Sequence, residues 1–371
     1  MKRLYIITEL FPPDETSTSY ILGEIANTCT SEYEVFVICG PEIYDSNKKF
    51  DVNHPFVLNK SIIVKRVGQS ITNKRTKIKK ALSLISMSVK LYKLAKHSIK
   101  KGDKVLLVTN PAPLVLLIAH LRKRIKFDFI LLVHDVFPEN LTLHNLHLPK
   151  FIYNRLKRAS DKAYGTADKL IALGRDMKIV LQKKIGKDKI INVVENWADT
   201  ENIKPIPFPQ SDSIIVEYAG NMGKAQGLER IITSLPEGVE LHLYGTGAME
   251  NILRSMDHPR VFFHGPYFRS QQEQILGSCH ASIVSLSDGM YGIGVPSKSY
   301  NIMASGRPII FMGPSNSEIA LTIIENKIGY IDWPNKWDNN EMVEMGCRAR
   351  ILAETVFSKQ TILEKFLNAI R

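Results

Sequence analysis

Three glycine-rich segments in the second half of the chain combine backbone freedom with positive charge. The first, Gly220-Asn-Met-Gly223-Lys224, directly follows an apolar run. Glycine lets the backbone approach a phosphate closely, and a helix beginning near Gln226 adds free N–H groups and the positive end of its dipole. The pattern therefore predicts a diphosphate site. It is equally typical of a turn that only joins two elements.

A second segment, Tyr291–Pro308, places Ser297 and Lys298 at the start of a short predicted helix that Gly306 terminates. A hydroxyl, an ammonium group and free N–H groups together suit a phosphate. Because Ser297 stands where the GxxxxGK[ST] loop has its second glycine, we do not expect an ATPase. A third segment, Gly245-Thr-Gly247, also ends an apolar run. Three such loops at successive strand ends indicate a nucleotide.

Other cofactor classes lack their sequence signals. Glu9–Tyr20 follows the first apolar run and contains no glycine, whereas a dinucleotide-binding fold requires GxGxxG there. The chain has no Asp-x-Asp pair, and its only closely spaced histidines, His144 and His147, lie in a predicted loop. We therefore expect no nicotinamide cofactor, no metal ion and no other bound cofactor. Protein groups must then take the charge of any diphosphate that leaves.

Short apolar runs alternate with helical segments along the whole chain. Runs that are apolar on both faces suit parallel strands covered by helices on both sides, and the alternation implies right-handed crossovers. Thirteen strands exceed one sheet, so we expect an α/β chain with two doubly wound, Rossmann-like parallel-sheet domains facing a cleft. Pro205, Pro207 and Pro209 mark the boundary between domains 1–203 and 204–350. The predicted strands are Arg3–Leu10, Tyr33–Gly40, Ile62–Val67, Val105–Asn110, Phe127–Asp135, Lys169–Gly174, Ile191–Trp197, Ile214–Asn221, Val239–Gly247, Val261–Gly265, Ala281–Ser287, Pro308–Gly313 and Ile328–Trp333.

Composition limits the setting of the protein. The 371 residues include 44% hydrophobic residues, which is ample for two cores. No apolar run reaches the roughly 18 residues of a transmembrane helix, and the run Leu4–Ile7 is too short for a signal peptide. Cys29, Cys39, Cys279 and Cys347 show no CxxC spacing. This predicts buried, reduced thiols in a cytoplasmic protein.

Positive charge is concentrated in the first half of the chain. Residues 1–200 carry 34 Lys and Arg against 19 Asp and Glu, whereas residues 201–371 carry 15 against 18. Lys60–Lys104 alone holds 14 basic residues and one acid. The two halves therefore face different partners.

Thr76–His97, within the basic region, is predicted to form a basic amphipathic helix. A domain helix with a solvated lysine face has the same pattern. The alternative is docking to an anionic membrane surface, where each lysine contributes about 1 kcal/mol. No recognition motif accompanies the charge, so we expect no nucleic-acid partner. The apolar positions are Ile78, Ala81, Leu82, Ile85, Val89 and Tyr92, and the flanking lysines are Lys77, Lys80, Lys90, Lys93 and Lys96.

Several short motifs occur in the order that they have in one enzyme family. Through them the sequence resembles the GT-B-fold glycosyltransferases, in particular the retaining family 4 group that builds bacterial surface polysaccharides. The resemblance spans residues 1 to 313. The matching segments are Phe11-Pro-Pro13, His134-Asp135-Val-Phe-Pro138-Glu139, Ala167-Asp168, Asn196-Trp-Ala-Asp199, Gly220-Asn-Met-Gly223 with Ala225-Gln-Gly-Leu228, Gly245-Thr-Gly247, and Val295-Pro-Ser-Lys298 with Met303-Ala-Ser-Gly306-Arg-Pro308.

The resemblance implies that the second domain binds a nucleotide-sugar donor and the first a saccharide or lipid-diphosphate-linked acceptor. A C-terminal helix within residues 351–371 would complete the first domain. Transfer would be retaining and metal-independent, in the cytoplasm at the inner face of the plasma membrane. The implied residues are His134, Asp135, Lys224 and Lys298 for catalysis; Gly220, Asn221, Gly223, Gly245, Gly247, Tyr267, Ser297 and Asn301 for the donor; and Glu9, Ser17, Glu139 and Asn196 for the acceptor.

Individual roles follow from the same resemblance. Lys224, Lys298 and the N–H groups at Gly223 and Ser297 would receive the charge that develops on the diphosphate. Asp135 would orient the acceptor hydroxyl, and His134 would contact the donor sugar. The alternative is that His134 and Asp135 only fix the loop that ends their strand.

The sequence departs from the family pattern at two places. Asn301 stands where many members have the second Glu of a Glu-x7-Glu motif, and Asp288 is the nearest substitute for the first. Asn221 and Gln226 replace an Arg and a Lys in the first phosphate loop, which leaves Lys224 as its single cation. Two alternatives therefore stay open, namely a nucleotide-sugar epimerase of the same fold and a catalytically idle scaffold subunit of a polysaccharide assembly complex.

Overall fold

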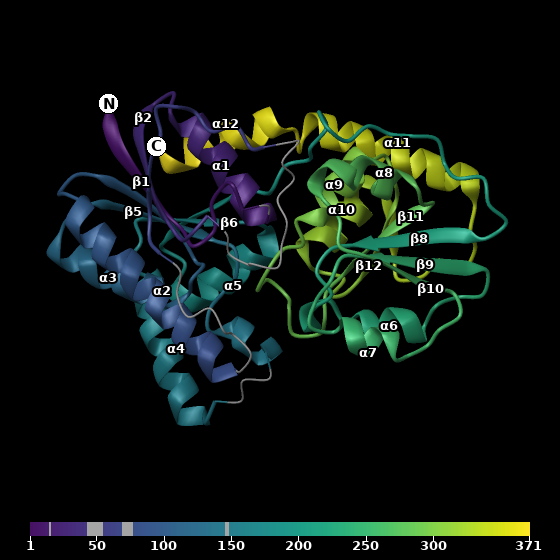
Figure 1. The fold of residues 1–371 in the computed structure, drawn as a ribbon, viewed down its shortest axis with the longest axis horizontal. Coiled ribbons are helices and arrows are strands. Elements are labelled where there is room, and N and C mark those ends of the chain that lie inside the picture. The colour runs from purple at the N-terminus through teal and green to yellow at the C-terminus, as the bar shows by residue number, and fades with distance from the viewer. Residues whose placement is uncertain (15, 43–54, 69–76, 145–147) are drawn as a thin grey trace. The chain divides into compact units, whose positions relative to one another are not determined.

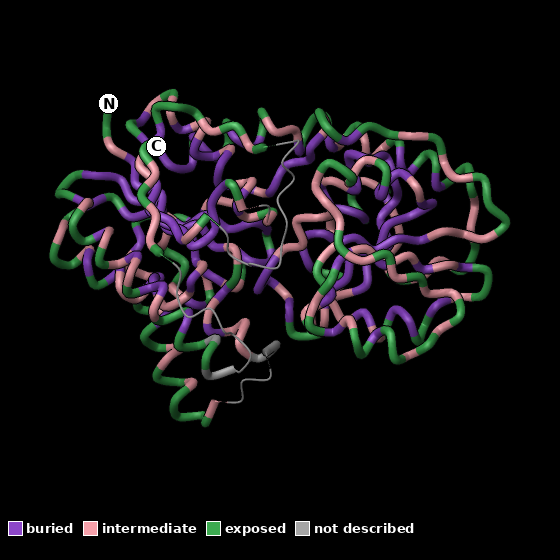
Figure 2. Tube along the Cα trace, viewed as in Figure 1, coloured by how far each residue is buried: buried purple, intermediate pink, exposed green. Residues whose placement is uncertain are grey.

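The chain folds into two compact units (Figure 1). The computed structural model describes residues 1–14, 16–42, 55–68, 77–144 and 148–371. Unit 1 comprises Met1–Val194 and Leu363–Arg371, and unit 2 comprises Glu195–Ile362. Each unit is built on its own parallel sheet, and buried residues line the interior of each (Figure 2).

Seven parallel strands form the sheet of unit 1, in the order β3-β2-β1-β4-β5-β6-β7. All residues of β4 are buried, as are all of β5 after Asp128, which parallel strands covered on both faces require. The strand order reverses between β1 and β4, the switch point at which such sheets bind ligands. The strands are β1 Lys2–Ile7, β2 Tyr33–Cys39, β3 Ile63–Arg66, β4 Lys104–Val108, β5 Asp128–Val133, β6 Lys169–Ala172 and β7 Ile190–Val193.

Helices connect these strands, and the C-terminal helix completes the unit. Leu363, Phe366 and Ile370 of that helix are buried. Lys104 Nζ donates to the carbonyl oxygens of Ile370 and Arg371, which fastens the end of the chain to β4. The helices are α1 Ser17–Cys29, α2 Lys77–Ser98, α3 Pro113–Arg124, α4 Lys150–Tyr164, α5 Arg175–Ile185 and α12 Lys359–Ile370, with a 3-10 helix at Glu139–His144.

Six parallel strands form the sheet of unit 2, in the order β10-β9-β8-β11-β12-β13. Ala219 pairs with Tyr244, so β8 and β9 end level and their following loops lie side by side. The strands are β8 Ile214–Ala219, β9 Val239–Tyr244, β10 Val261–Gly265, β11 Ala281–Ser285, β12 Ile309–Met312 and β13 Gly329–Ile331. The helices are α6 Leu228–Thr233, α7 Glu250–Arg254, α8 Gln272–Gly277, α9 Lys298–Ala304, α10 Glu318–Asn326 and α11 Asn339–Thr355, with 3-10 turns at Lys224–Gln226 and Arg269–Gln271.

The predicted fold class is confirmed, since both units are α/β bodies on parallel sheets. Each predicted strand is present, and most end a few residues before the predicted end. The units divide at Val194, earlier than the predicted boundary after residue 203. The reason is that Ala198 N–H donates to Phe357 O and Arg350 to Thr200 O, which ties this segment to unit 2.

The expectations for membrane-spanning helices and for the four cysteines can be compared with the structure. Within the described ranges, no helix is long and apolar enough to cross a membrane. Cys29, Cys39 and Cys279 are buried free thiols, as predicted, but Cys347 on α11 is exposed, so the prediction of burial is wrong for that residue. Its neighbours along α11 alternate between buried and exposed faces, and Cys347 falls on the exposed one.

Candidate functional site

The loops that follow β8 and β9 in unit 2 interlock through their glycines. Gly220 N–H donates to Tyr244 O, and Met222 N–H donates to Thr246 O, both at 2.9 Å. A Cβ at Gly245 would lie 2.1 Å from Gly220 O, and one at Gly247 would lie 2.3 Å from Met222 O. Only glycine fits at these two positions. Their demonstrated role is therefore to pack two loops together, and a role in binding the donor stays a prediction.

Lys298, the first residue of α9, places its ammonium group against the loop after β8. Its Nζ lies 3.4 Å from the centroid of the Tyr218 ring. A Cβ at Gly220, whose φ is +150°, would meet this Nζ at 2.7 Å. Within the described residues, the Nζ is buried without a hydrogen-bond partner. Burial lowers the pKa of Lys298, and the contact with the ring offers the charge only partial compensation.

Glu217 on β8 is the charged group that acts on Lys298. The residue is 1% exposed, and both carboxylate oxygens are buried with no hydrogen-bond partner in the described part of the chain. Burial raises the pKa of Glu217, while Ser282, its register partner on β11, and Lys298 oppose that shift. Glu217 in turn raises the pKa of Lys298 against the effect of burial. The two residues thus form an electrostatic pair without a direct hydrogen bond.

Lys224 lies on the 3-10 turn between Gly223 and Gly227 and is exposed. The turn is held by side chains at and just after the end of β11, because Ser285 Oγ donates to Gln226 O at 2.5 Å and Ser287 Oγ to Lys224 O at 2.6 Å. The Gly223 N–H donates to Gln226 Oε1 at 3.0 Å. That N–H, expected to be open to a phosphate, is therefore already bonded in this structure, and the α-helix begins only at Leu228.

Asn301 on α9 forms hydrogen bonds through both polar atoms of its side-chain amide. Its Oδ1 accepts from Asp199 N–H at 3.1 Å, and its Nδ2 donates to Gln272 Oε1 at 2.9 Å. Asp199 also forms an ion pair with Arg269 at 2.9 Å. Burial raises the pKa of Tyr267 to about 12, and Gln272 acts in the opposite direction. Asn301 and Tyr267 therefore meet the same glutamine, and Tyr267 is a neutral phenol.

In unit 1, His134 and Asp135 follow β5, and Thr109 Oγ1 accepts from the backbone N–H groups of both. Burial lowers the pKa of His134 to about 4, so the ring is neutral at neutral pH. Its Nε2 is buried without a hydrogen-bond partner among the described residues. Asp135 is exposed. His134 can thus exchange a hydrogen bond with a hydroxyl, but it cannot supply a positive charge.

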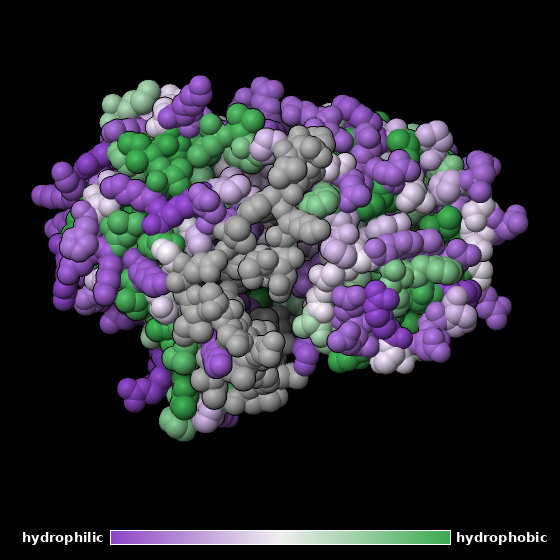
Figure 3. Space-filling view, viewed as in Figure 1, coloured by the Kyte–Doolittle hydropathy of each residue, from purple (hydrophilic) through white to green (hydrophobic). Residues whose placement is uncertain are grey.

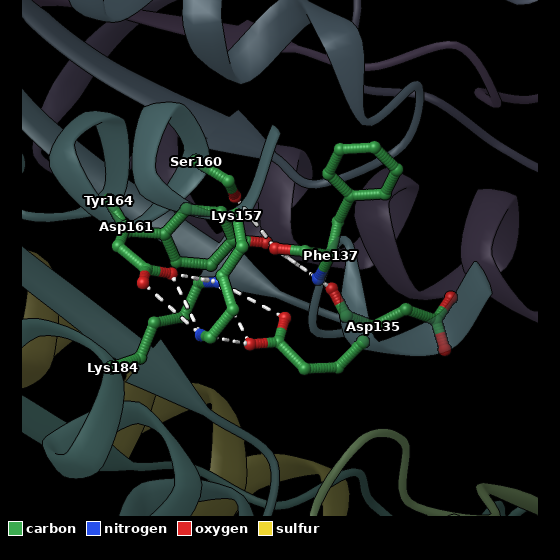
Figure 4. A network of polar contacts seen from close by, with 8 residues as sticks. Asp135, Phe137, Lys157, Ser160, Asp161, Tyr164 and Lys184 are labelled. Carbon is green, nitrogen blue, oxygen red and sulfur yellow. Dashed lines mark hydrogen bonds and ion pairs between the residues drawn. The ribbon is translucent and has the colours of Figure 1, made fainter. Parts of the chain in front are cut away.

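The loop that carries Asp135 is anchored by α4 (Figure 4). The Phe137 N–H donates to the Tyr164 hydroxyl at 3.3 Å, and that hydroxyl donates to Asp135 O at 3.5 Å. Ser160 Oγ donates to Phe137 O at 2.7 Å. Two side chains of one helix therefore fix the backbone on both sides of Val136.

Glu139, a predicted acceptor residue, lies in an ion-pair network beside that anchor (Figure 4). Its carboxylate pairs with Lys157 at 2.8 Å and with Lys184 at 3.0 Å, and both lysines also pair with Asp161. Burial alone would raise the pKa of Glu139, but the two lysines more than offset it and lower the pKa. Its carboxylate is thus already engaged within unit 1.

The other three predicted acceptor residues are divided between the two units. Glu9 is buried after β1, and Ser17 is the exposed first residue of α1, both in unit 1. Asn196 is buried and belongs to unit 2. His147 lies outside the described residues. Among those described, no three His, Cys, Asp or Glu side chains form a group that could hold a metal ion.

Sequence reasoning missed Glu217, Gln272 and the Asp199–Arg269 pair. Glu217 had a readable signal, because it is the one charged residue in the apolar strand Ile214–Ala219. A carboxylate inside a parallel strand is buried on either face and needs a partner. Gln272 and Arg269 gave no such signal, since polar residues in a loop and at a helix start are ordinary.

Two Rossmann-like units, the second with interlocking glycine loops and a buried lysine, make up the GT-B fold of glycosyltransferases. No family model matches the sequence. The chain is 27% identical over 403 aligned positions to the probable glycosyltransferase WbjE of Pseudomonas aeruginosa, with 100% of this chain and 98% of the relative covered.

Solved structures show the same fold. Sucrose-phosphate synthase from Thermosynechococcus elongatus aligns with a TM-score of 0.76 at 13% identity, over 99% of this chain and 98% of that one. Anabaena Alr3699/HepE in complex with UDP-glucose aligns with a TM-score of 0.67 at 14% identity, over 100% and 99%. The curated relative and both solved structures match essentially the full length of this chain.

Proposed function

We propose that this protein is a glycosyltransferase that moves a sugar from a nucleoside diphosphate sugar, bound by unit 2, to a saccharide acceptor bound by unit 1, in the synthesis of a surface polysaccharide. Three observations support it. They are the GT-B fold, the end-to-end similarity to WbjE, and the arrangement around Lys298. The UDP-glucose held by the structurally similar HepE makes a uridine nucleotide the first donor to test.

The buried ammonium of Lys298 carries the proposal. A buried charge without a hydrogen bond is costly, and an anion beside Gly220 would remove that cost. Part of the Lys298 residue remains accessible, so rotation of its long side chain brings the ammonium group to the loop surface. There it meets a diphosphate together with the exposed Lys224.

The proposed transfer is retaining and independent of metals and other cofactors, as the sequence resemblance implies. The anomeric C–O bond breaks through an oxocarbenium-like state, and the negative charge passes to the diphosphate. The acceptor oxygen bonds to the anomeric carbon from the same face, and its proton passes to the departing diphosphate. Lys298 and Lys224 stabilise that charge, and losing one such donor typically costs about 3–4 kcal/mol of transition-state stabilisation. Neutral His134 bonds a donor-sugar hydroxyl, and Asp135 accepts a hydrogen bond from the attacking acceptor hydroxyl.

Calorimetric titration with UDP, GDP, dTDP, ADP and UDP-glucose tests this function. We expect the wild type to bind one of these nucleotides and Lys298→Ala to bind it about 100-fold more weakly. Lys336→Ala is the matched control, because Lys336 is an exposed lysine of the same unit, and its affinity should be unchanged.

The alternatives give different results in the same experiment. A scaffold subunit binds none of the nucleotides. An epimerase converts the bound nucleotide sugar without any acceptor, which NMR of the sugar protons detects. A retaining transferase gives a product whose anomeric configuration equals that of the donor.

We further propose that unit 1 docks on the anionic inner face of the plasma membrane and takes its acceptor from a lipid diphosphate there. The α2 stripe, which we define as Leu82, Ile85, Val89, Lys93 and Lys96, supports this because all five residues are exposed. Leu82 is 50%, Ile85 52% and Val89 37% exposed. A helix that only packs in its domain would bury the apolar positions that here face solvent.

The buried side of α2 is a different set of residues, namely Ser83, Met87, Ser88, Leu91 and Ala95. Of the apolar positions predicted from periodicity, Ala81, Leu82, Ile85 and Val89 thus face outward, and Tyr92 is partly buried. Phe151 and Ile152 at the start of α4 are also exposed, and hydrophobic residues reach the surface at the lower end of unit 1 (Figure 3). Residues 69–76 of the basic region and the side chains of Lys77, Ile78 and Lys80 lie outside the described part of the structure.

A further inference from the structure

Two buried ionisable groups in unit 2 have no hydrogen-bond partner within the described residues. They are the Glu217 carboxylate and the Lys298 ammonium group. Both lie at β8, because Glu217 belongs to that strand and the Lys298 Nζ is 3.4 Å from the ring of the next residue, Tyr218. Neither is explained by packing, because apolar side chains of the same size would fill these positions at lower cost. The proposed function uses Lys298 but leaves Glu217 without a role.

A lysine beside a diphosphate is useful only while it is protonated. Burial lowers the pKa of Lys298, so the empty site tends to discharge it. Two features oppose that loss. The Tyr218 ring lies 3.4 Å from the ammonium nitrogen, and the charge of Glu217 raises the pKa of Lys298. Of these two, only Glu217 can carry a full negative charge, and Lys298 in turn lowers the pKa of Glu217 against the effect of burial.

The other titratable groups that face this pair stay neutral near pH 7. They come from four segments of unit 2: Tyr218 on β8, Tyr244 on β9, Tyr267 after β10 and Cys279 before β11. Burial raises the pKa of each of these groups, to about 12 for Tyr267 and Cys279. Glu217 is therefore the counter-charge for Lys298 inside this part of unit 2.

We propose that Glu217 is a positioning residue that keeps Lys298 protonated and held against Gly220 while no nucleotide is bound. This rests on the proposed function, because it assigns Lys298 to the diphosphate. When a diphosphate arrives, it replaces Glu217 as the partner of the ammonium group. Glu217 touches neither nucleotide nor sugar.

The direct test is the titration of Lys298 itself, followed by NMR of 13Cε-labelled lysine in the full chain, with the signal assigned by its loss in Lys298→Met. Glu217→Gln keeps the size of the side chain and removes its charge. We expect its Lys298 signal to titrate at a pH lower by about one unit or more than in the wild type. Glu217→Asp, which restores the charge, should recover most of the difference.

A control variant separates the charge of Glu217 from a general effect of buried carboxylates. Glu318→Gln removes a buried carboxylate from α10 of the same unit, and no influence of Glu318 on the pKa of Lys298 is found. Its Lys298 signal should titrate as in the wild type. If Glu217→Gln does not fold, Glu217→Asp alone tests the inference. Its shorter side chain places the carboxylate farther from Lys298, so Lys298 should titrate at a slightly lower pH than in the wild type, and an unchanged titration would contradict the inference.

Nucleotide affinity supplies the second readout. Affinity of the wild type for UDP, or for whichever nucleotide of the panel binds, should fall as pH rises through the pKa of Lys298. In Glu217→Gln the fall should begin at lower pH, so the variant binds nearly normally in acid and about tenfold more weakly at neutral pH. A purely structural role would weaken binding equally at every pH.

The outcomes distinguish this inference from the proposed function. An unchanged Lys298 titration in Glu217→Gln overturns the inference, whether or not nucleotides bind. A shifted titration in a protein that binds no nucleotide supports the role of Glu217 and removes the proposed function. A shifted titration together with a shifted binding profile supports both.

Discussion

At the scale of single residues, two buried cations of unit 2 show how a structural and a ligand-binding role differ. The Arg307 guanidinium donates to the carbonyl oxygens of Ile206, Pro207, Gly277 and Cys279, and it lies 4.1 Å from the centroid of the Phe208 ring. Its Nε and Nη2 groups thus donate to four backbone carbonyl oxygens. The Lys298 ammonium group lies 3.4 Å from the centroid of the Tyr218 ring and has no hydrogen-bond partner among the described residues. A buried cation without hydrogen bonds is stabilised by binding an external anion, whereas a cation already bonded by the protein gains little from one.

We predict that Arg307→Lys destabilises unit 2 strongly. One ammonium group cannot reach four carbonyl oxygens that a planar guanidinium reaches together, and each buried carbonyl left without a donor costs about 1–3 kcal/mol. The loss should therefore be about 3 kcal/mol or more, measured as the shift of the unit 2 transition in urea.

Arg254→Lys is the control for this change. Arg254 is an exposed arginine of unit 2 that pairs with Glu250 along one helix, so its replacement should alter stability by less than about 0.5 kcal/mol. Equal losses in the two variants would show that buried carbonyl capping is not what Arg307 contributes.

The sequence predicted which residues belong to the candidate site better than it predicted their hydrogen-bond partners. Lys298 and Gly220 were predicted together, and the structure places them in contact. Asn301 was expected to bind the donor, and in the structure its amide is bonded to Asp199 and Gln272. A motif records which residue stands at a position. It does not record that a residue 102 positions away along the chain donates to it.

At the scale of elements, periodicity predicts a helical face but not the direction in which that face points. Leu82, Ile85 and Val89 were correctly grouped on one side of α2, and that side is exposed rather than packed. The strands had no such ambiguity, because a parallel strand is buried on both faces whichever way it turns. This is why the strand positions were predicted well from the sequence. Whether the apolar face of α2 is buried or exposed could be read only from the structure.

We predict that the α2 stripe decides membrane binding. Leu82→Ser, Ile85→Ser and Val89→Ser together should abolish sedimentation with vesicles of phosphatidylglycerol and phosphatidylcholine, because each side chain contributes about 1.5–3 kcal/mol when fully buried. Lys93→Ala with Lys96→Ala should reduce only the preference for the acidic lipid, by about 2 kcal/mol in all.

The control replaces an equally exposed apolar residue outside unit 1. Ile351 on α11 is 60% exposed, and Ile351→Ser should sediment with vesicles as the wild type does. Wild-type sedimentation of the triple α2 variant would rule out this surface as the membrane contact.

At the scale of the whole molecule, unit 1 is discontinuous in sequence. The chain completes unit 2 and then returns Leu363–Arg371 to the first unit. The alternation of strands and helices predicted two sheets, because each strand or helix is indicated by residues that are close together in the sequence. It could not show where the last helix packs, because an amphipathic helix at the end of a chain fits the surface of either sheet. Lys104 on β4 settles it by bonding the carbonyls of the last two residues.

We predict that a chain ending at Ile362 loses the fold of unit 1 and keeps that of unit 2. Leu363, Phe366, Leu367 and Ile370 are buried, and exposing their partners in unit 1 costs more than about 5 kcal/mol, which equals the whole stability of many domains. Scanning calorimetry should show the unit 2 transition unchanged and the unit 1 transition absent or far lower. Arg371→Ala removes the surface ion pair with Glu32 and a hydrogen bond to Asn368, and it should leave both transitions in place. Two intact transitions in the shortened chain would mean that β1–β7 hold unit 1 together without its C-terminal helix.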